Sequence, residues 1–342
     1  MRWTDIYVAG GASALGRREE TATAVAEGRY DAAVRDADGF LAVSVADDDG
    51  PATDLAVRAA RRALTRAAVP PERIRLLVHA GIGPQGPAHV APASRVHGAA
   101  VGGVASAVEV RQSSNGGMTG IELAAAYLAA APAGTAAMVT TADRFTRVDR
   151  YRADAGNVLG DGGTALVLTR GTGVARLLST VVLGDGRFAD IGLADSSVFP
   201  DRPAFFAEHG HRLLDLVAAM SQRQRESVRQ ALAEAGVAGP AGISRWAFDN
   251  VGLTMVDRDF RTELGIDDSV TCWEWGRTVG HLGAGDPAAG LVHLLETGAV
   301  GPGDRVALCG MGSGFTYSCA VVEVVDAPAW DVTDRSEGGE RV

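Results

Sequence analysis

The spacing of apolar and polar residues predicts an alternation of helices and strands. Residues 54–68, DLAVRAARRALTRAA, place apolar side chains on one helical face and arginines on the opposite face. The run RLLVHA at 75–80 follows as a short apolar strand. RESVRQALAEAG at 225–236 and RWAFDN at 245–250 repeat this plan. The alternation predicts an α/β protein with mostly parallel strands and interior helices.

The same offset relates further segments of the two halves. Leu64 and Leu232, in the two amphipathic segments, lie 168 positions apart. The turn-and-strand segments at 134–141 and 303–310 keep nearly the same separation. A repeat of about half the chain is the signature of an internal duplication, so we expect two similar halves.

The length of the chain agrees with two packed halves. Its 342 residues exceed the usual size of one compact domain. We place the halves at 1–170 and 171–330, followed by a polar tail at 331–342 that we expect to be disordered. The sequence has no run of 18 apolar residues and does not begin like a signal peptide. We therefore expect a soluble cytoplasmic protein without a membrane partner.

Composition excludes several classes of function. The formal net charge of −10 argues against nucleic acid as a partner, because binding to phosphates needs clustered positive charge. All 32 basic residues are arginines, which excludes Schiff-base chemistry and a lysine-containing phosphate loop. The three cysteines lie far apart without metal-ligand spacing. We expect neither disulfides nor a bound metal.

The stretch SSNGG at 113–117 is the first candidate for chemistry. Two serines and an asparagine stand before a glycine pair and an apolar helical run. Ser113 or Ser114 is a candidate nucleophile at a strand-to-helix turn. Serine and asparagine are also preferred helix caps, so a capping role for Ser114 is the alternative.

The repeat pairs Ser114 with His281, which lies in a second glycine-rich loop before an apolar helix. A pseudo-twofold arrangement would bring the two side chains together at its centre. A serine needs an adjacent base to take its proton, and the base works best when a third group orients it. Asp286, five residues after the histidine, is that candidate. Because Pro287 follows it, Asp286 is alternatively a helix cap, or it serves both roles.

Four stretches together carry a resemblance to a known family. They are SSNGGMTGIELA (113–124), LGDGGTALVL (159–168), GHLGAGDPAAG (280–290) and GMGSGFTYSCAVV (310–322). With the repeat, they resemble the ketosynthase III enzymes over nearly the whole chain. The resemblance implies the thiolase fold, in which duplicated halves form a layered αβαβα sandwich. It places the helices that begin near Gly116 and Pro287 in the middle.

The resemblance also implies roles for single residues. The family's nucleophilic cysteine falls on Ser114, its first histidine on Asp249, and its asparagine on His281. These changes argue against decarboxylative carbon–carbon bond formation. The chain is similar to a smaller branch, the ketosynthase III-like acyltransferases of antibiotic pathways, in which a serine or cysteine works with a histidine and an aspartate. The implied oxyanion donors are the backbone amides of Ser114 and Ser313.

Substrates and partners follow from the same resemblance. It implies an acyl donor carried by coenzyme A or by a phosphopantetheinyl carrier protein, no permanently bound cofactor, and a small-molecule acceptor. It also implies a homodimer that pairs the strand near 108–113 with its mate. Asp249 and Asn250 are candidates to contact the acceptor. Arginines that crowd one segment are candidates to guide the anionic donor: Arg144, Arg147, Arg150 and Arg152.

Three functions remain open. The leading expectation is an acyltransferase that forms an ester on Ser114 and passes the acyl group to a hydroxyl or amine of a secondary-metabolite intermediate. The second is starter-unit selection or condensation for a polyketide synthase. The third is a thiolase-fold partner subunit without activity. Formation of an acyl adduct on the serine separates the first function from the third.

Overall fold

The computed structural model describes most of the chain. It covers residues 1–342 except for 48, 147, 152–155, 188, 190–201, 329 and 331–342. The tail predicted to be disordered, 331–342, therefore lies outside the described residues, as does Arg147.

Nine strands form one mixed sheet in the order β5-β4-β6-β7-β1-β8-β11-β10-β9. Their bounds are β1 Arg2–Leu15, β4 Ile74–Ala80, β5 Ser106–Val110, β6 Ala136–Asp143, β7 Gly162–Arg170, β8 Ala175–Gly184, β9 Arg245–Ala247, β10 Arg305–Gly312 and β11 Thr316–Val324. A separate two-stranded sheet joins β2, Arg17–Glu20, to β3, Ala42–Val45.

The expectation of mostly parallel strands is wrong. Only the pairs β4–β5, β4–β6 and β9–β10 are parallel, three of the eight pairings in the large sheet. The pairs β6–β7 and β10–β11 are antiparallel because each second strand follows the first without a crossover helix among the described residues. The sequence pattern predicted strands but did not predict these antiparallel connections.

The order of the strands confirms the duplication. The series β4-β6-β7-β1 in one half matches β9-β10-β11-β8 in the other, with the same strand directions. The first residues of β1 pair antiparallel with β8 and join the two halves. The edge strand β5 has no counterpart in the second half among the described residues. The boundary near residue 170 stays a prediction.

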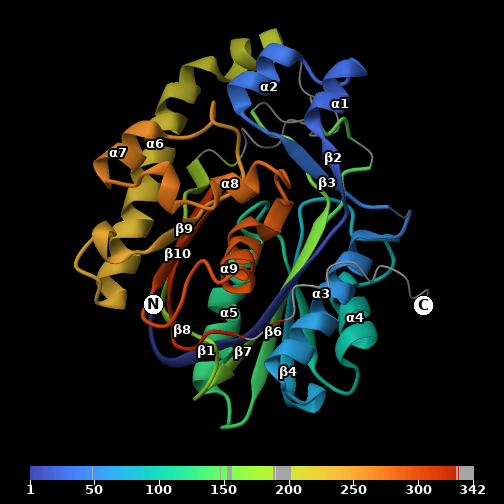
Figure 1. Cartoon of the computed structure of the whole chain (residues 1–342), viewed down its shortest axis with the longest axis vertical. Coiled ribbons are helices and arrows are strands. Elements are labelled where there is room, and N and C mark those ends of the chain that lie inside the picture. The colour runs from blue at the N-terminus through green and yellow to red at the C-terminus, as the bar shows by residue number, and fades with distance from the viewer. Residues whose placement is uncertain are drawn as a thin grey trace.

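The helices lie in three layers around the two halves of the sheet. Their bounds are α1 Thr21–Ala26, α2 Ala32–Asp38, α3 Ala52–Ala67, α4 Pro92–Val96, α5 Gly116–Ala130, α6 Arg202–Ala235, α7 Arg258–Glu263, α8 Trp273–Gly276 and α9 Asp286–Glu296. Figure 1 shows α5 and α9 together in the middle, with α3 and α4 outside one half and α6 outside the other. This αβαβα arrangement is the thiolase fold that the resemblance implies.

Three apolar clusters correspond to these layers. The central cluster joins Ile121 of α5 and Leu291 of α9 to both halves of the sheet. Outer clusters hold Leu55 of α3 and Val228 of α6. The helix α5 is apolar on most sides because it is covered from two directions, whereas α3 needs only one apolar face. Each fully buried side chain of this size contributes about 1.5–3 kcal/mol to folding.

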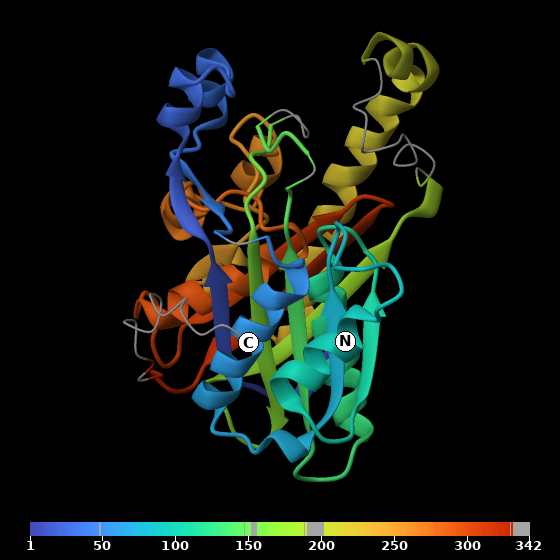
Figure 2. The same ribbon diagram turned by 90° about the vertical axis from the view of Figure 1, so that its right-hand side faces the viewer.

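Several helices extend beyond one end of the sheet. Figure 2 shows α1 and α2 projecting there on one side and α6 on the other. Among the described residues, no helix combines the length and the apolar composition needed to cross a membrane.

Candidate active site

A tight turn between β5 and α5 positions the two candidate serines. Ser113 has a φ of 47°, in the left-handed region that side-chain-bearing residues rarely adopt. The amide of Gly116 donates to the Ser113 carbonyl at 3.1 Å, which closes the turn. The N-cap residue of α5 is Asn115, and its side chain makes no capping bond. Ser114 is therefore not the helix cap, and its hydroxyl has a different partner.

The structure brings Ser114, His281 and Asp286 into one hydrogen-bonded series. Ser114 Oγ lies 2.9 Å from His281 Nε2, and His281 Nδ1 lies 2.5 Å from Asp286 Oδ2. His281 is 4% exposed and Asp286 is fully buried. With Nδ1–H donating to the carboxylate, Nε2 is the nitrogen that accepts a proton from the serine. This is the order of groups that activates a hydroxyl nucleophile.

The carboxylate of Asp286 is surrounded by N–H donors. Besides His281, the amide of Leu282 donates to Oδ1 at 2.7 Å and the amide of Asn250 donates to Oδ2 at 2.8 Å. Asn250 Nδ2 donates to Oδ1 at 3.1 Å. The N-cap residue of α9 is Gly285, and no side chain caps this helix. Asp286 thus bonds the preceding loop rather than the first turn of its own helix.

The LGDGG segment fixes the backbone of His281. The His281 amide donates to the Val158 carbonyl at 2.8 Å, and the Gly160 amide donates to the His281 carbonyl at 2.8 Å. On the opposite side, α5 packs directly on this loop. A β-carbon on Gly117 would lie 2.4 Å from the carbonyl oxygen of Ala284, so only glycine permits this approach.

Asp143, at the end of β6, is a buried carboxylate that the sequence analysis missed. Its oxygens accept from the amides of Ile82, Gly83 and Ala284 at 2.7, 2.9 and 2.9 Å. Burial raises its pKa to about 6, against the effects of these amides and of nearby His281. Asp143 thereby ties the loop after β4 to the histidine loop. An acidic residue ending an apolar strand was the only signal in the sequence.

The two residues expected to contact the acceptor, Asp249 and Asn250, have different contacts in the structure. Asn250 is 3% exposed and directs its amide to Asp286, which assigns it to the support of the site. Asp249 Oδ2 accepts from the Met311 amide at 2.8 Å. Asp249 Oδ1 is buried without a partner among the described residues, although the residue as a whole keeps some exposed surface. Burial, and then the nearby Asp286 carboxylate, raise the pKa of Asp249 to about 8.

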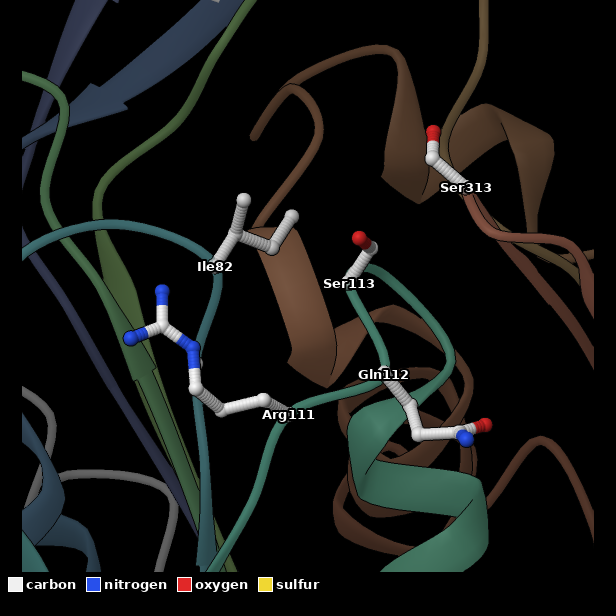
Figure 3. A pocket seen from close by; sticks show the side chains of 6 residues that line it. Ile82, Arg111, Gln112, Ser113 and Ser313 are labelled. Atoms are coloured by element: carbon white, nitrogen blue, oxygen red, sulfur yellow. The ribbon is translucent and has the colours of Figure 1, made fainter. Parts of the chain in front are cut away.

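A small hollow opens beside the serine turn. It is lined by Gly81, Ile82, Arg111, Gln112, Ser113 and Ser313. Figure 3 shows Ile82 and Arg111 on one side, facing Ser113 and Ser313 on the other. The turn between β10 and β11, which carries Ser313, lies close to the serine turn. A β-carbon added to Gly312 would be only 2.3 Å from the Gln112 carbonyl oxygen. Ser113 lines the hollow, whereas the Ser114 hydroxyl is held by His281.

The described arginines of the 144–152 segment are structural. Arg144 is 8% exposed and donates to the Gly50 carbonyl, so its position gives no support to a role in guiding a donor over the surface. Arg150 donates to the Leu159 carbonyl at 2.6 Å and to Asp161 Oδ2 at 3.2 Å. Arg147 and Arg152 lie outside the described residues. In the ranges that the structure covers, no three His, Cys, Asp or Glu side chains are grouped to hold a metal.

Comparison with known proteins shows which family this chain is similar to. Residues 108–186 match the model for 3-oxoacyl-[acyl-carrier-protein (ACP)] synthase III, and residues 211–324 match the model for its C-terminal part. Beta-ketoacyl-[acyl-carrier-protein] synthase III of Rhodospirillum centenum is 29% identical over 297 residues, which cover 83% of this chain and 87% of that protein.

Solved structures agree with this result. ChlB3, described as an acyltransferase, is 35% identical with a TM-score of 0.88, and the match covers 96% of this chain and 100% of that one. 3-Oxoacyl-(acyl carrier protein) synthase III of Xanthomonas oryzae pv. oryzae has a TM-score of 0.75 at 21% identity, covering 94% and 100%, and supports the fold alone. The chain belongs to the 3-oxoacyl-[acyl-carrier-protein] synthase III, or ketosynthase III, family.

Proposed function

We propose that this protein is an acyltransferase that carries the acyl group as an ester on Ser114. The observation behind this proposal is the series Ser114–His281–Asp286, with both bonds within hydrogen-bond distance. Membership of the ketosynthase III family and the likeness to ChlB3, described as an acyltransferase, support an enzyme that handles acyl groups. We propose a coenzyme A or phosphopantetheinyl carrier-protein thioester as donor.

In the acylation step, Ser114 Oγ attacks the thioester carbonyl. His281 Nε2 takes the hydroxyl proton as the oxygen–carbon bond forms. The carbon–sulfur bond then breaks, and the proton passes from the imidazolium to the leaving thiolate, which departs as the thiol. Asp286 stabilises the imidazolium in between. We assign the oxyanion to the backbone amides of Ser114 and Ser313.

In the transfer step, the acceptor replaces the thiol. His281 takes a proton from a hydroxyl or amine of a small secondary-metabolite intermediate as it attacks the ester. The serine oxygen leaves and regains the proton. A thioester is the more activated acyl donor, so passage to an oxygen ester and then to an ester or amide runs downhill or level.

Condensation for a polyketide synthase, with selection of the starter unit, is the second candidate. Its support is the family itself. Against it, Asp249 stands where the condensing enzymes carry their first histidine, and His281 stands at their asparagine. A partner subunit without activity is the third candidate, and the hydrogen-bonded series Ser114–His281–Asp286 argues against it. We further propose a cytoplasmic homodimer without a permanently bound cofactor.

The test is intact-protein mass spectrometry after incubation with acyl coenzyme A or an acyl carrier protein. We expect one acyl adduct on the native chain, none on Ser114→Ala, and an undiminished adduct on Ser113→Ala, the adjacent serine as matched control. Ser114→Cys should still accept an acyl group, since a thiol is intrinsically more nucleophilic. His281→Ala should slow acylation by roughly 10²–10⁴-fold.

Two results would overturn the proposal. A β-ketoacyl product from a malonyl thioester would favour condensation. The absence of any adduct with every donor tested would favour the inactive partner subunit.

A further inference from the structure

Besides Asp143, two carboxylates, Asp249 and Asp286, lie close to the His281 imidazole, and the surroundings of these two differ. Asp286 accepts from four N–H groups, contributed by His281, by Leu282 and twice by Asn250. Asp249 accepts only the amide of Met311, and its second oxygen is buried without a partner among the described residues. A buried negative charge is stable where donors surround it and costly where they do not.

Asn250 causes much of this difference. It directly follows Asp249 in the chain, yet its backbone amide and its side-chain amide both donate to Asp286. Its Nδ2 also donates to the Gly280 carbonyl at 3.0 Å. Its Oδ1 packs on Gly276, where a β-carbon would lie only 2.3 Å away. These contacts hold the side chain in one orientation.

We infer that Asn250 is a positioning residue, which places the single negative charge of the Asp249–Asp286 pair on Asp286, next to His281 Nδ1. Asp249 then carries the proton. The catalytic meaning of this inference rests on the proposed acyl transfer, whereas the placement of charge is a property of the resting protein.

A single negative charge on the Asp249–Asp286 pair suits the proposed mechanism. A second negative charge, on Asp249, would favour the imidazolium further and weaken His281 as a base at neutral pH. None would leave the imidazolium unsupported after it takes the serine proton. The other titratable groups nearby are Asp143 at the end of β6, which interacts with His281, and Cys309 on β10, which interacts with Asp249.

The test is a titration of His281 in the resting protein, without an acyl donor. Histidine labelled with ¹⁵N reports the ring by NMR, and the His281 signals are those missing from His281→Gln. Asp286→Asn should lower the midpoint of His281 by on the order of one unit or more, because the facing charge is lost. Asp249→Asn should leave the midpoint unchanged, because an amide replaces a neutral carboxyl.

Asn250→Ala should lower the midpoint in the same direction as Asp286→Asn but by less, because Asp286 loses one donor and its fixed orientation. The matched control is Ser179→Ala, which removes another buried side-chain hydrogen bond, to the Ala231 carbonyl, away from the site. It should lower thermal stability and leave the midpoint alone. If Asn250→Ala does not fold, Asn250→Ser, smaller yet still a donor, should give a smaller drop.

The outcomes are distinct. A midpoint unchanged in the Asn250 variant means that Asn250 is only structural, and a drop in Asp249→Asn means that the charge lies on Asp249. Either result overturns the inference. In parallel, Asn250→Ala should lower the single-turnover acylation rate roughly tenfold at unchanged KM, a loss of about 1.4 kcal/mol. A native chain without any acyl adduct would refute the proposed function and leave the titration result standing.

Discussion

A serine as the proposed nucleophile makes different demands on the rest of the site than a cysteine would. A thiol reacts as its partly formed thiolate, whereas a serine hydroxyl stays protonated at neutral pH. The nucleophile therefore needs a base in direct contact, and His281 Nε2 lies 2.9 Å from Ser114 Oγ. The histidine in turn needs a carboxylate, which Asp286 provides. The three proposed catalytic residues therefore depend on one another chemically.

Asp286→Asn tests whether this carboxylate acts on the imidazole. An amide cannot stabilise the imidazolium, and its NH₂ group would face the donors that now surround the carboxylate. We expect acylation to slow by roughly 10³–10⁴-fold, as measured by single-turnover mass spectrometry. The matched control is Asp31→Asn, because Asp31 caps α2 through the amides of Ala33 and Val34, and asparagine caps equally well. A native rate in Asp286→Asn would reduce Asp286 to a structural role.

Asp249 gives a prediction for stability as a function of pH. Its pKa rises from an ordinary 3.8 to about 8 on folding. The folded chain therefore holds a proton that the unfolded chain releases, so the free energy of unfolding falls as pH rises from about 4 to about 8. Asn does not titrate. The Tm of Asp249→Asn relative to the native protein should increase across this window by at least about 2 °C and then level off. Scanning calorimetry at several pH values measures it, and a constant difference would contradict the protonated carboxyl.

At the scale of elements, the repeat offset carried the most information. It predicted the contact between Ser114 and His281, which are 167 positions apart, whereas the family resemblance placed the helices α5 and α9 in the centre. Strand direction was not predictable from periodicity, because apolar runs look alike in parallel and antiparallel pairs. Asn250 was assigned to the acceptor since nothing in FDNVG shows where an amide points.

Gly117→Ala should separate the two elements that carry the proposed nucleophile and base. The added methyl group would collide with the Ala284 carbonyl oxygen, which belongs to the backbone of the histidine loop and cannot rotate away. We expect a loss of about 1–3 kcal/mol in the free energy of unfolding, together with slower acylation. Chemical denaturation and the adduct assay measure the two effects.

The control for this variant is Gly210→Ala. Gly210 lies in α6, and among the described residues no atom lies within 4 Å of an added β-carbon, so alanine should be neutral or stabilising there. Native stability and a native acylation rate in Gly117→Ala would show that α5 can shift without disturbing the site.

At the scale of the molecule, the duplication explains where the site lies. Each half contributes one glycine-rich loop at the start of a central helix, and the two loops meet where α5 and α9 pack together (Figure 1). The two halves are not equivalent at their outer edges. The sheet ends at β9 in one half and continues to the extra strand β5 in the other. This extra strand is the feature that the duplication leaves unexplained.

The strand β5 predicts how two copies of the chain associate. Its outer edge has no strand beside it among the described residues, and Val108 on it is 43% exposed. Two residues of the adjoining helix α5, Leu123 and Tyr127, are also exposed, at 46% and 38%. An apolar edge strand is a template for pairing, and a twofold contact between identical strands covers both copies at once. We expect light scattering at micromolar concentration to show a dimer.

Val108→Asp should convert this dimer to a monomer. Twofold pairing would bring two new carboxylates close together in a poorly solvated interface. Because each copy contributes one, a single substitution introduces two charges that repel each other. The matched control is Val217→Asp, on the α6 surface, where the native side chain is 62% exposed and the dimer should persist. Because β5 leads directly into the serine turn and the hollow beside it, the monomer should also acylate more slowly than the control. A native protein that is monomeric at micromolar concentration, or a Val108→Asp protein that remains dimeric, would contradict pairing through β5.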